Sequence, residues 1–176
     1  EMYCFKNERV AAWVLMLLVL ISSCDETSDV KALYNIDSLI NSQVEFLHSR
    51  QVKLHKIASI SGRKDDRVFV PGDSAAWSVE LDIFRKLETI NKPVNRGSYI
   101  VDDGLFDPSS NLTVKAISAI DDLPVRYVRI SYQHSIDKPR KIEALYDDRN
   151  ALYESGRILT MGFQQINDKT ILTTYS

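Results

Sequence analysis

Paired aspartates are the most conspicuous residues in this sequence that could do chemistry. Calcium prefers several carboxylate and carbonyl oxygens around it, and the best candidate site is the loop 102–111, DDGLFDPSSN. This loop lacks the alternating ligands and the closing glutamate of an EF-hand. Aspartates are also common in turns, because the side chain bonds its own backbone, so we favour turns and expect neither a metal nor a cofactor. The pairs are Asp65-Asp66, Asp102-Asp103, Asp121-Asp122 and Asp147-Asp148.

The three histidines are the candidates for a general base near neutral pH. His48 and His55 fall on one predicted helix, about 10 Å apart at 1.5 Å per residue, which is too far for one zinc ion. His134 falls in a predicted turn. The serines of Ser61-Gly62 and Ser155-Gly156 are outside the GxSxG setting of a nucleophile elbow. A hydrolase would therefore need a site assembled from scattered residues, and the catalytic residues stay unknown.

Aromatic side chains gather in the C-terminal half and could line a ligand cavity. On a curved sheet they could surround an apolar space, and the candidate lining residues are Tyr127, Tyr132, Tyr146 and Phe163. The alternative is ordinary packing between a sheet and helices, which we favour because aromatic residues dominate most protein cores.

The N-terminus has the layout of a secretion signal. Lys6 and Arg9 precede twelve uninterrupted apolar residues, Val10–Ile21, which are followed by two serines and Cys24. A positive segment, a short apolar segment and small residues at the end are typical of a signal peptide. The apolar run is too short to span a bilayer comfortably, which takes about 20 residues. A buried core helix is the alternative.

Ile21-Ser22-Ser23-Cys24 resembles the lipobox of bacterial lipoprotein precursors: a branched apolar residue, two small residues and a cysteine. In that family a diacylglyceryl group is attached to the cysteine thiol, and a peptidase then cuts just before it. The resemblance implies cleavage between Ser23 and Cys24, lipidation of Cys24, and a location in the cell envelope at the outer membrane. Cys24-Asp25-Glu26-Thr27 resembles the acidic tether of surface-exported lipoproteins of Bacteroidota.

The expected processing divides the chain into three parts. These are a signal peptide at 1–23, a lipidated tether at 24–29 and a single domain at 30–176. The chain without residues 1–23 keeps 20 of 22 Lys+Arg and 22 of 24 Asp+Glu, so its net charge is still −2. No basic block is present, which argues against a nucleic-acid partner. The sequence leaves open whether Glu1 and Ser176 are the natural ends.

Two helices are predicted before residue 91. Val30–Ser61 contains neither Gly nor Pro, and its apolar residues recur at steps of three and four, which predicts one long helix that ends at Gly62. Arg67–Val70 is a short strand candidate that follows this helix. Asp73 or Ser74 then caps a second helix that runs to about Ile90. Its expected buried face comprises Trp77, Leu81, Phe84 and Leu87.

From Tyr99 the hydrophobic period changes to two, which predicts strands joined by short turns. The predicted fold class is therefore α+β, with two N-terminal helices packed on an antiparallel β-meander. Whether the sheet curves into a half-barrel is left open. The predicted strands are 98–102, 112–118, 125–133, 140–146, 151–154, 157–165 and 169–175.

Three functions are compatible with these patterns. The leading one is a membrane-anchored envelope lipoprotein that acts as a non-enzymatic binding or assembly module with a protein partner. The second is a carrier of lipid or another apolar ligand, because helices followed by a meander resemble the half-barrel lipoprotein carriers of the bacterial envelope. The third is an envelope hydrolase.

Overall fold

The first helix of the structure is short and buries a single apolar stripe. In the computed structural model, which describes residues 32–149 and 152–176, α2 spans Ile36–Ser49. Asn35 caps it, because its Oδ1 accepts a hydrogen bond from the Ser38 backbone N–H at 2.9 Å. The buried side chains are spaced by three and four residues, as expected for one helix face. They are Ile36, Ile40, Gln43, Val44 and Leu47.

A β-hairpin follows α2, in the stretch where the sequence predicts that the helix continues. Strands β1 (Leu54–Ile60) and β2 (Arg63–Phe69) pair antiparallel through a two-residue turn. In that turn Ser61 has a φ of 50° and Gly62 a φ of 78°, as a type I′ turn requires. Every residue of β2 is exposed. The prediction of one helix over 30–61 is therefore wrong after Ser49, and also at 32–35, which precede α2 and are not helical. Residues 30 and 31 lie outside the described chain.

The second helix forms where the sequence predicts it. α3 spans Ser74–Arg85, and the Oδ1 of Asp73 caps it by accepting a hydrogen bond from the Ala76 N–H at 2.7 Å. It continues into the 3₁₀ helix η1 (Lys86–Asn91), which is followed by η2 (Pro93–Asn95). The predicted buried face is confirmed, because its members are at most 2% exposed. They are Trp77, Leu81, Phe84 and Leu87.

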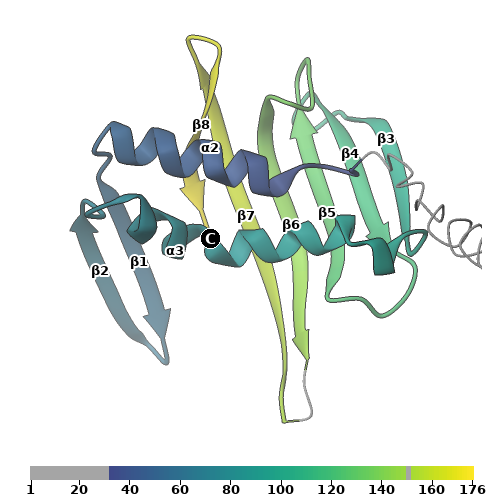
Figure 1. The fold of residues 1–176 in the computed structure, drawn as a ribbon, viewed down its shortest axis with the longest axis horizontal. Helices are drawn as coiled ribbons and strands as arrows, with labels where there is room; N and C mark the ends of the chain where they lie inside the picture. Colours follow the sequence, from purple (N-terminus) through teal and green to yellow (C-terminus); the bar gives the residue numbers. More distant parts are fainter. Residues whose placement is uncertain (1–31, 150–151) are drawn as a thin grey trace, which may run out of the picture. The chain divides into compact units, whose positions relative to one another are not determined.

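The six later strands form one antiparallel sheet in which neighbours in the sequence are neighbours in space (Figure 1). β7 and β8 are joined by Asn167 and Asp168, with φ values of 48° and 63°. Strand β7 stands where the sequence predicts two shorter strands, at 151–154 and 157–165. Residue 151 lies outside the described chain. The strands are β3 (Tyr99–Asp107), β4 (Leu112–Ala119), β5 (Val125–Tyr132), β6 (Pro139–Arg149), β7 (Glu154–Ile166) and β8 (Lys169–Tyr175).

Strand β3 continues through a point where the sequence predicts a turn. The register with β4 shifts between Asp102 and Leu105, and Gly104 there has a φ of 79°. This is the signature of a β-bulge, in which extra residues bend a strand without ending its pairing. Asp102-Asp103 therefore lies within a strand, as do the pairs at 65–66 and 147–148. The turn interpretation is wrong for these three pairs.

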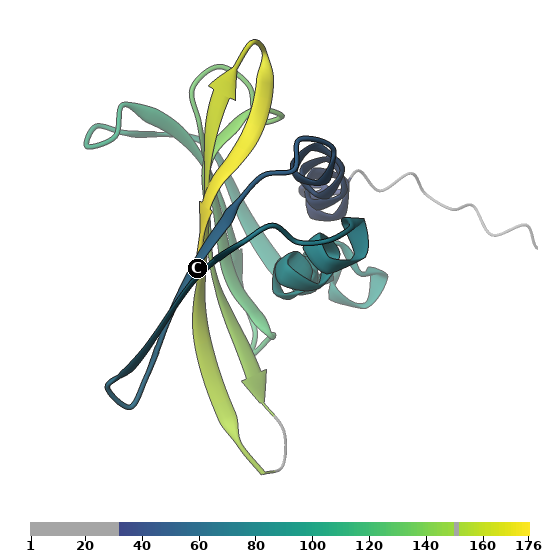
Figure 2. The same cartoon turned by 90° about the vertical axis from the view of Figure 1, so that its left-hand side faces the viewer.

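Both helices lie on the same face of the six-stranded sheet (Figure 2). Their buried stripes meet alternate residues of the central strands, and together they form one hydrophobic core. The sheet residues of this core include Ile117, Val128, Ile130, Ile142 and Met161, each at most 1% exposed. Residues 32–176 form one compact unit around this core, so we expect them to fold on their own.

The predicted fold class is wrong. The helices do not form an N-terminal pair that precedes the strands, because the β1–β2 hairpin separates them in the chain. Within residues 32–149 and 152–176, two α-helices stand against eight strands, which lie in one two-stranded and one six-stranded sheet. The physical reason is that residues 54–60 pair with residues 63–69 as strands, and this pairing leaves only 36–49 for the first helix.

Candidate functional site

The four aromatic residues proposed to line a ligand cavity do not converge. Tyr146 and Phe163 are buried in the core beneath the helices, 9% and 5% exposed. Tyr132 lies at the end of β5, where its hydroxyl donates to Asp103 Oδ1 at 3.3 Å. Tyr127 lies on the opposite face of the sheet from Tyr146, since it alternates with the core residue Val128. The four side chains therefore do not line a single cavity.

The face of the sheet that lies opposite α2 and α3, here called the outer face, carries exposed apolar side chains. No helix of the described residues covers it (Figure 2). Alternation along the strands places Ile100, Leu105 and Ile158 on it, and these are 55%, 49% and 65% exposed. Large apolar side chains that remain solvent-exposed on one face are typical of interaction sites when they are contiguous.

A groove of about 520 Å³ opens on this outer face. Four adjacent strands build it, from β3 at the sheet edge to β6 in the middle. The apolar wall comes from β3 and β4, and the polar groups come from β5 and β6. Its lining residues are Leu105, Ala116, Ser118, Tyr127, Arg129 and Glu143.

The polar side of the groove is a small charged network. Glu143 accepts hydrogen bonds from Lys141 Nζ at 2.7 Å and from the Tyr127 hydroxyl at 3.5 Å. The bond from Lys141 lowers the pKa of Glu143 below its usual value. Burial, followed by the charge of Glu143, raises the pKa of Tyr127. Arg129 lies directly across the strands from Glu143. The groove therefore presents both charges beside an apolar wall, which suits an amphipathic binding partner.

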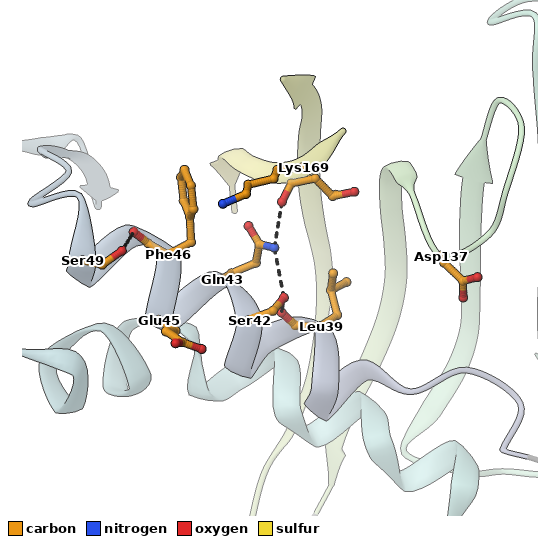
Figure 3. Close-up of a pocket in the computed structure, with 9 residues that line it drawn as sticks. Leu39, Ser42, Gln43, Glu45, Phe46, Ser49, Asp137 and Lys169 are labelled. Atoms are coloured by element: carbon orange, nitrogen blue, oxygen red, sulfur yellow. Dashed lines mark hydrogen bonds between the residues drawn. The ribbon is translucent and has the colours of Figure 1, made fainter. Parts of the chain in front are cut away.

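A second cavity, of about 440 Å³, lies between α2 and β8 (Figure 3). Its central residue is Gln43, which is 2% exposed and points from α2 toward β8. Gln43 Nε2 donates to the Thr170 carbonyl at 3.0 Å, and its Oε1 accepts from the Leu172 N–H at 2.8 Å. Because β8 is an edge strand, this amide satisfies backbone groups that would otherwise lack a strand partner. We therefore assign this cavity wall a structural role.

Sequence reasoning missed Gln43, although a signal was present. It lies three residues after Ile40 and four before Leu47, within the apolar stripe of α2. A polar side chain at such a position must find a buried partner, because an unpaired buried amide is destabilising.

The histidines are distributed over three elements. His48 is half-buried near the end of α2, and His134 is exposed in the loop between β5 and β6. His55 is exposed on β1, where its Nε2 lies 2.7 Å from Asp66 Oδ1. This contact lowers the pKa of Asp66. Neither of the two cavities described above is lined by a histidine.

In the loop 102–111, the candidate calcium site, the Asp107 carboxylate stabilises a turn. Asp107 Oδ1 accepts from the Ser109 N–H at 3.0 Å and from its hydroxyl at 2.7 Å, while Oδ2 accepts from Ser110 Oγ at 2.8 Å. These bonds lower the pKa of Asp107. Among the residues that the structure describes, no three His, Cys, Asp or Glu side chains gather as a metal site.

The predicted lipidation and cleavage residues, Ser23 and Cys24, lie outside the described residues. In the described chain, neither helix has the length and hydropathy to cross a bilayer. No protein-family model, no curated protein and no solved structure matches this chain.

Proposed function

We propose that this protein is an envelope lipoprotein, anchored through a lipid on Cys24, whose folded part is a non-enzymatic binding module. The lipobox-like residues Ile21–Cys24 support the anchor. The binding role is supported by the one-sided sheet, in which the helices cover one face and the other keeps apolar side chains in solvent.

The observation that carries the proposal is the groove on the outer face. Exposed apolar side chains that are bordered by polar residues are typical of binding sites. Here Leu105 and Tyr127 lie beside Arg129 and Glu143, so apolar contact and charge pairing are available together. A protein surface with an apolar centre and a polar rim would match this arrangement.

Site-specific photo-cross-linking in cells that make the protein tests the binding role. A photoreactive amino acid at Ile158, on the outer face and 65% exposed, should yield a discrete adduct with a partner. The matched control is the same photoreactive amino acid at Val79 on α3, which is 76% exposed and lies on the face of the sheet that the helices cover. It should give no adduct. Equal labelling at both positions, or none at Ile158, would contradict the proposal.

Membrane fractionation tests the anchor separately. The full chain should partition into the membrane fraction, with a mass increase on the mature protein that matches a diacylglyceryl-modified cysteine. The variant Cys24→Ala should lose that mass. If Cys24→Ala retains the lipid mass, the anchor assignment is wrong, whatever the result of cross-linking.

A lipid or apolar-ligand carrier is the second candidate. The observation that favours it is that Tyr127 and Leu105 line an open groove. Native mass spectrometry of gently purified residues 25–176 distinguishes the two roles. A copurifying lipid-sized mass that Leu105→Asp abolishes would favour the carrier, and a clean apo mass would favour a protein partner.

A further inference from the structure

We propose that molecules of this protein associate head to tail, with strand β2 of one molecule adding to the free edge of β3 in the next. Two exposed strands, each with an edge that no described strand pairs, carry this inference. An open edge is a template for pairing with another chain, and adding a strand is a common mode of recognition.

The β1–β2 hairpin, residues 54–69, is a projecting arm. Leu54, at its base, is its only buried residue, and Lys56 Nζ fixes it to Glu80 of α3 at 2.7 Å. Beyond this base, Ile57, Ile60 and Val68 are 56%, 75% and 63% exposed. Since a two-stranded hairpin is at best marginally stable alone in water, the arm would gain stability from a third strand.

Strand β3 is the acceptor. It forms one edge of the six-stranded sheet, and all of its residues from Ile100 to Phe106 are exposed. It carries apolar side chains on both faces, such as Leu105 and Phe106. Proteins commonly protect such an edge with lysine, proline or a covering element. Here the described residues supply only the bulge at 102–105 and the aspartates of the strand.

Charge selects the pairing of unlike edges. Strand β2 contains three Lys and Arg against two Asp, a net charge of +1. The other basic residue of the hairpin, Lys56 on β1, is paired with Glu80 of α3. Strand β3 contains three Asp and no basic residue, a net charge of −3. A symmetric β3–β3 pair would therefore set aspartates against aspartates, whereas the arm brings opposite charge to the edge.

The arm and the acceptor lie at opposite ends of the described unit (Figure 1). A molecule therefore cannot pair its own hairpin with its own β3. Each molecule offers one arm and one acceptor, so the contact is heterologous and propagates into a chain of molecules.

Sedimentation of purified residues 25–176 tests the proposal without the lipid. The mean mass should rise with concentration from about 1 µM to about 1 mM, the range in which weak complexes form. It should fall with added salt, because the charges are exposed. A constant monomer mass over this range would overturn the proposal.

Two variants should each weaken assembly. The arm variant, Arg63→Glu with Lys64→Glu, reverses the charge of two basic side chains of β2. The edge variant, Ile100→Lys with Asp102→Lys, places two lysines on β3. All four side chains are exposed. We expect each to weaken self-association by at least about tenfold in Kd. Thermal unfolding should show both folded. The control, Lys92→Glu with Arg96→Glu, makes the same charge change as the arm variant at another exposed place and should assemble normally.

Mixing the two variants is the decisive step. The arm variant retains its acceptor and the edge variant retains its arm, so the mixture should have a higher mean mass than either variant alone. If the mixture stays monomeric, or if either variant assembles alone like the unmodified protein, head-to-tail pairing is refuted.

Discussion

The two faces of the six-stranded sheet are built from the same strands yet have different surroundings. On β5, Val128 and Ile130 are fully buried against the helices, while Tyr127 and Arg129, which alternate with them, line the groove of the outer face. On β6, Ala144 is fully buried and the neighbouring Glu143 reaches the groove. A shift of one residue along the chain thus moves a side chain from the core to the candidate binding surface.

This difference separates the residues that stabilise the fold from those that we propose for binding. The helix-covered face has one continuous core that includes Trp77 and Phe84. The outer face keeps apolar groups in solvent, where they add little to folding and are available for contact. Substitutions on the two faces should therefore affect different measurements.

Truncating one isoleucine on each face of the sheet should show the largest difference in the free energy of unfolding. Ile130→Ala removes a fully buried side chain and should lower the free energy of unfolding by about 2–5 kcal/mol. Ile158→Ala, on the outer face, should change it by less than about 0.5 kcal/mol. Urea unfolding of both variants measures this, and equal losses would mean that the outer face is covered in solution.

Gln43→Ala should have the next largest effect. The change leaves the Leu172 N–H and the Thr170 carbonyl without their partner, and should cost about 1–3 kcal/mol in the free energy of unfolding. The control is Ser38→Ala, an exposed residue of α2, which should cost less than about 0.5 kcal/mol. Hydrogen exchange at the Leu172 amide should accelerate only in the Gln43 variant.

Tyr175→Phe should have a smaller effect that depends on pH. Phe84 packs edge-on against the Tyr175 ring, and the Tyr175 hydroxyl donates to Glu80 at 3.2 Å; losing that bond should cost about 0.5–1.5 kcal/mol near neutrality. Burial, then Glu80, raises the pKa of Tyr175 above its usual value.

The raised pKa sets the direction of the alkaline effect. The stability linked to this proton is present below the unfolded pKa of about 10 and is lost as the pH rises above it. Tyr175→Phe should therefore make the alkaline decline in stability shallower, as measured by urea unfolding between about pH 8 and pH 11. An unchanged decline would mean that the hydroxyl titrates normally.

Glu143→Gln, on the outer face, should have a small effect on folding. Because Lys141 lowers the folded-state pKa of Glu143, its contribution is present above the unfolded pKa of about 4.3 and is lost as the pH falls below that value. We expect less than about 1 kcal/mol at neutral pH, screened by salt. The variant should nonetheless reduce the yield of the adduct at Ile158, and an unaffected adduct would place the partner away from the groove.

Elements whose apolar residues fit only one hydrophobic period could be predicted from the sequence. Elements whose spacing fits both a helix and a strand could not. α3 was predicted because Trp77, Leu81 and Phe84 keep a helical spacing behind the Asp73 cap. Strand β1 was missed because Leu54 and Ala58 are four residues apart, a spacing that fits one helical turn as well as two repeats of a strand. The turn at Ser61-Gly62 was equally ambiguous, since a positive φ serves a helix end and a type I′ turn alike.

The candidate site was only partly predictable for a related reason. Tyr127 was named as a ligand-lining residue and does line the groove, but Tyr146 and Phe163 belong to the core. A strand pattern shows which residues share a face, but not which face the helices cover. Register shifts near Tyr127 and Phe163 also change the alternation between distant residues. Arg129 and Glu143 gave no signal, because isolated charges on strands are common.

The pairing of Gln43 with β8 has a consequence for the order in which the chain can fold. The two hydrogen bonds join residues 127 and 129 positions apart, so α2 acquires its buried polar partner only after β8 has been made. Contacts of such long separation form late, since the intervening chain must first be ordered. During synthesis, α2 would therefore lack this partner until β8 has been made.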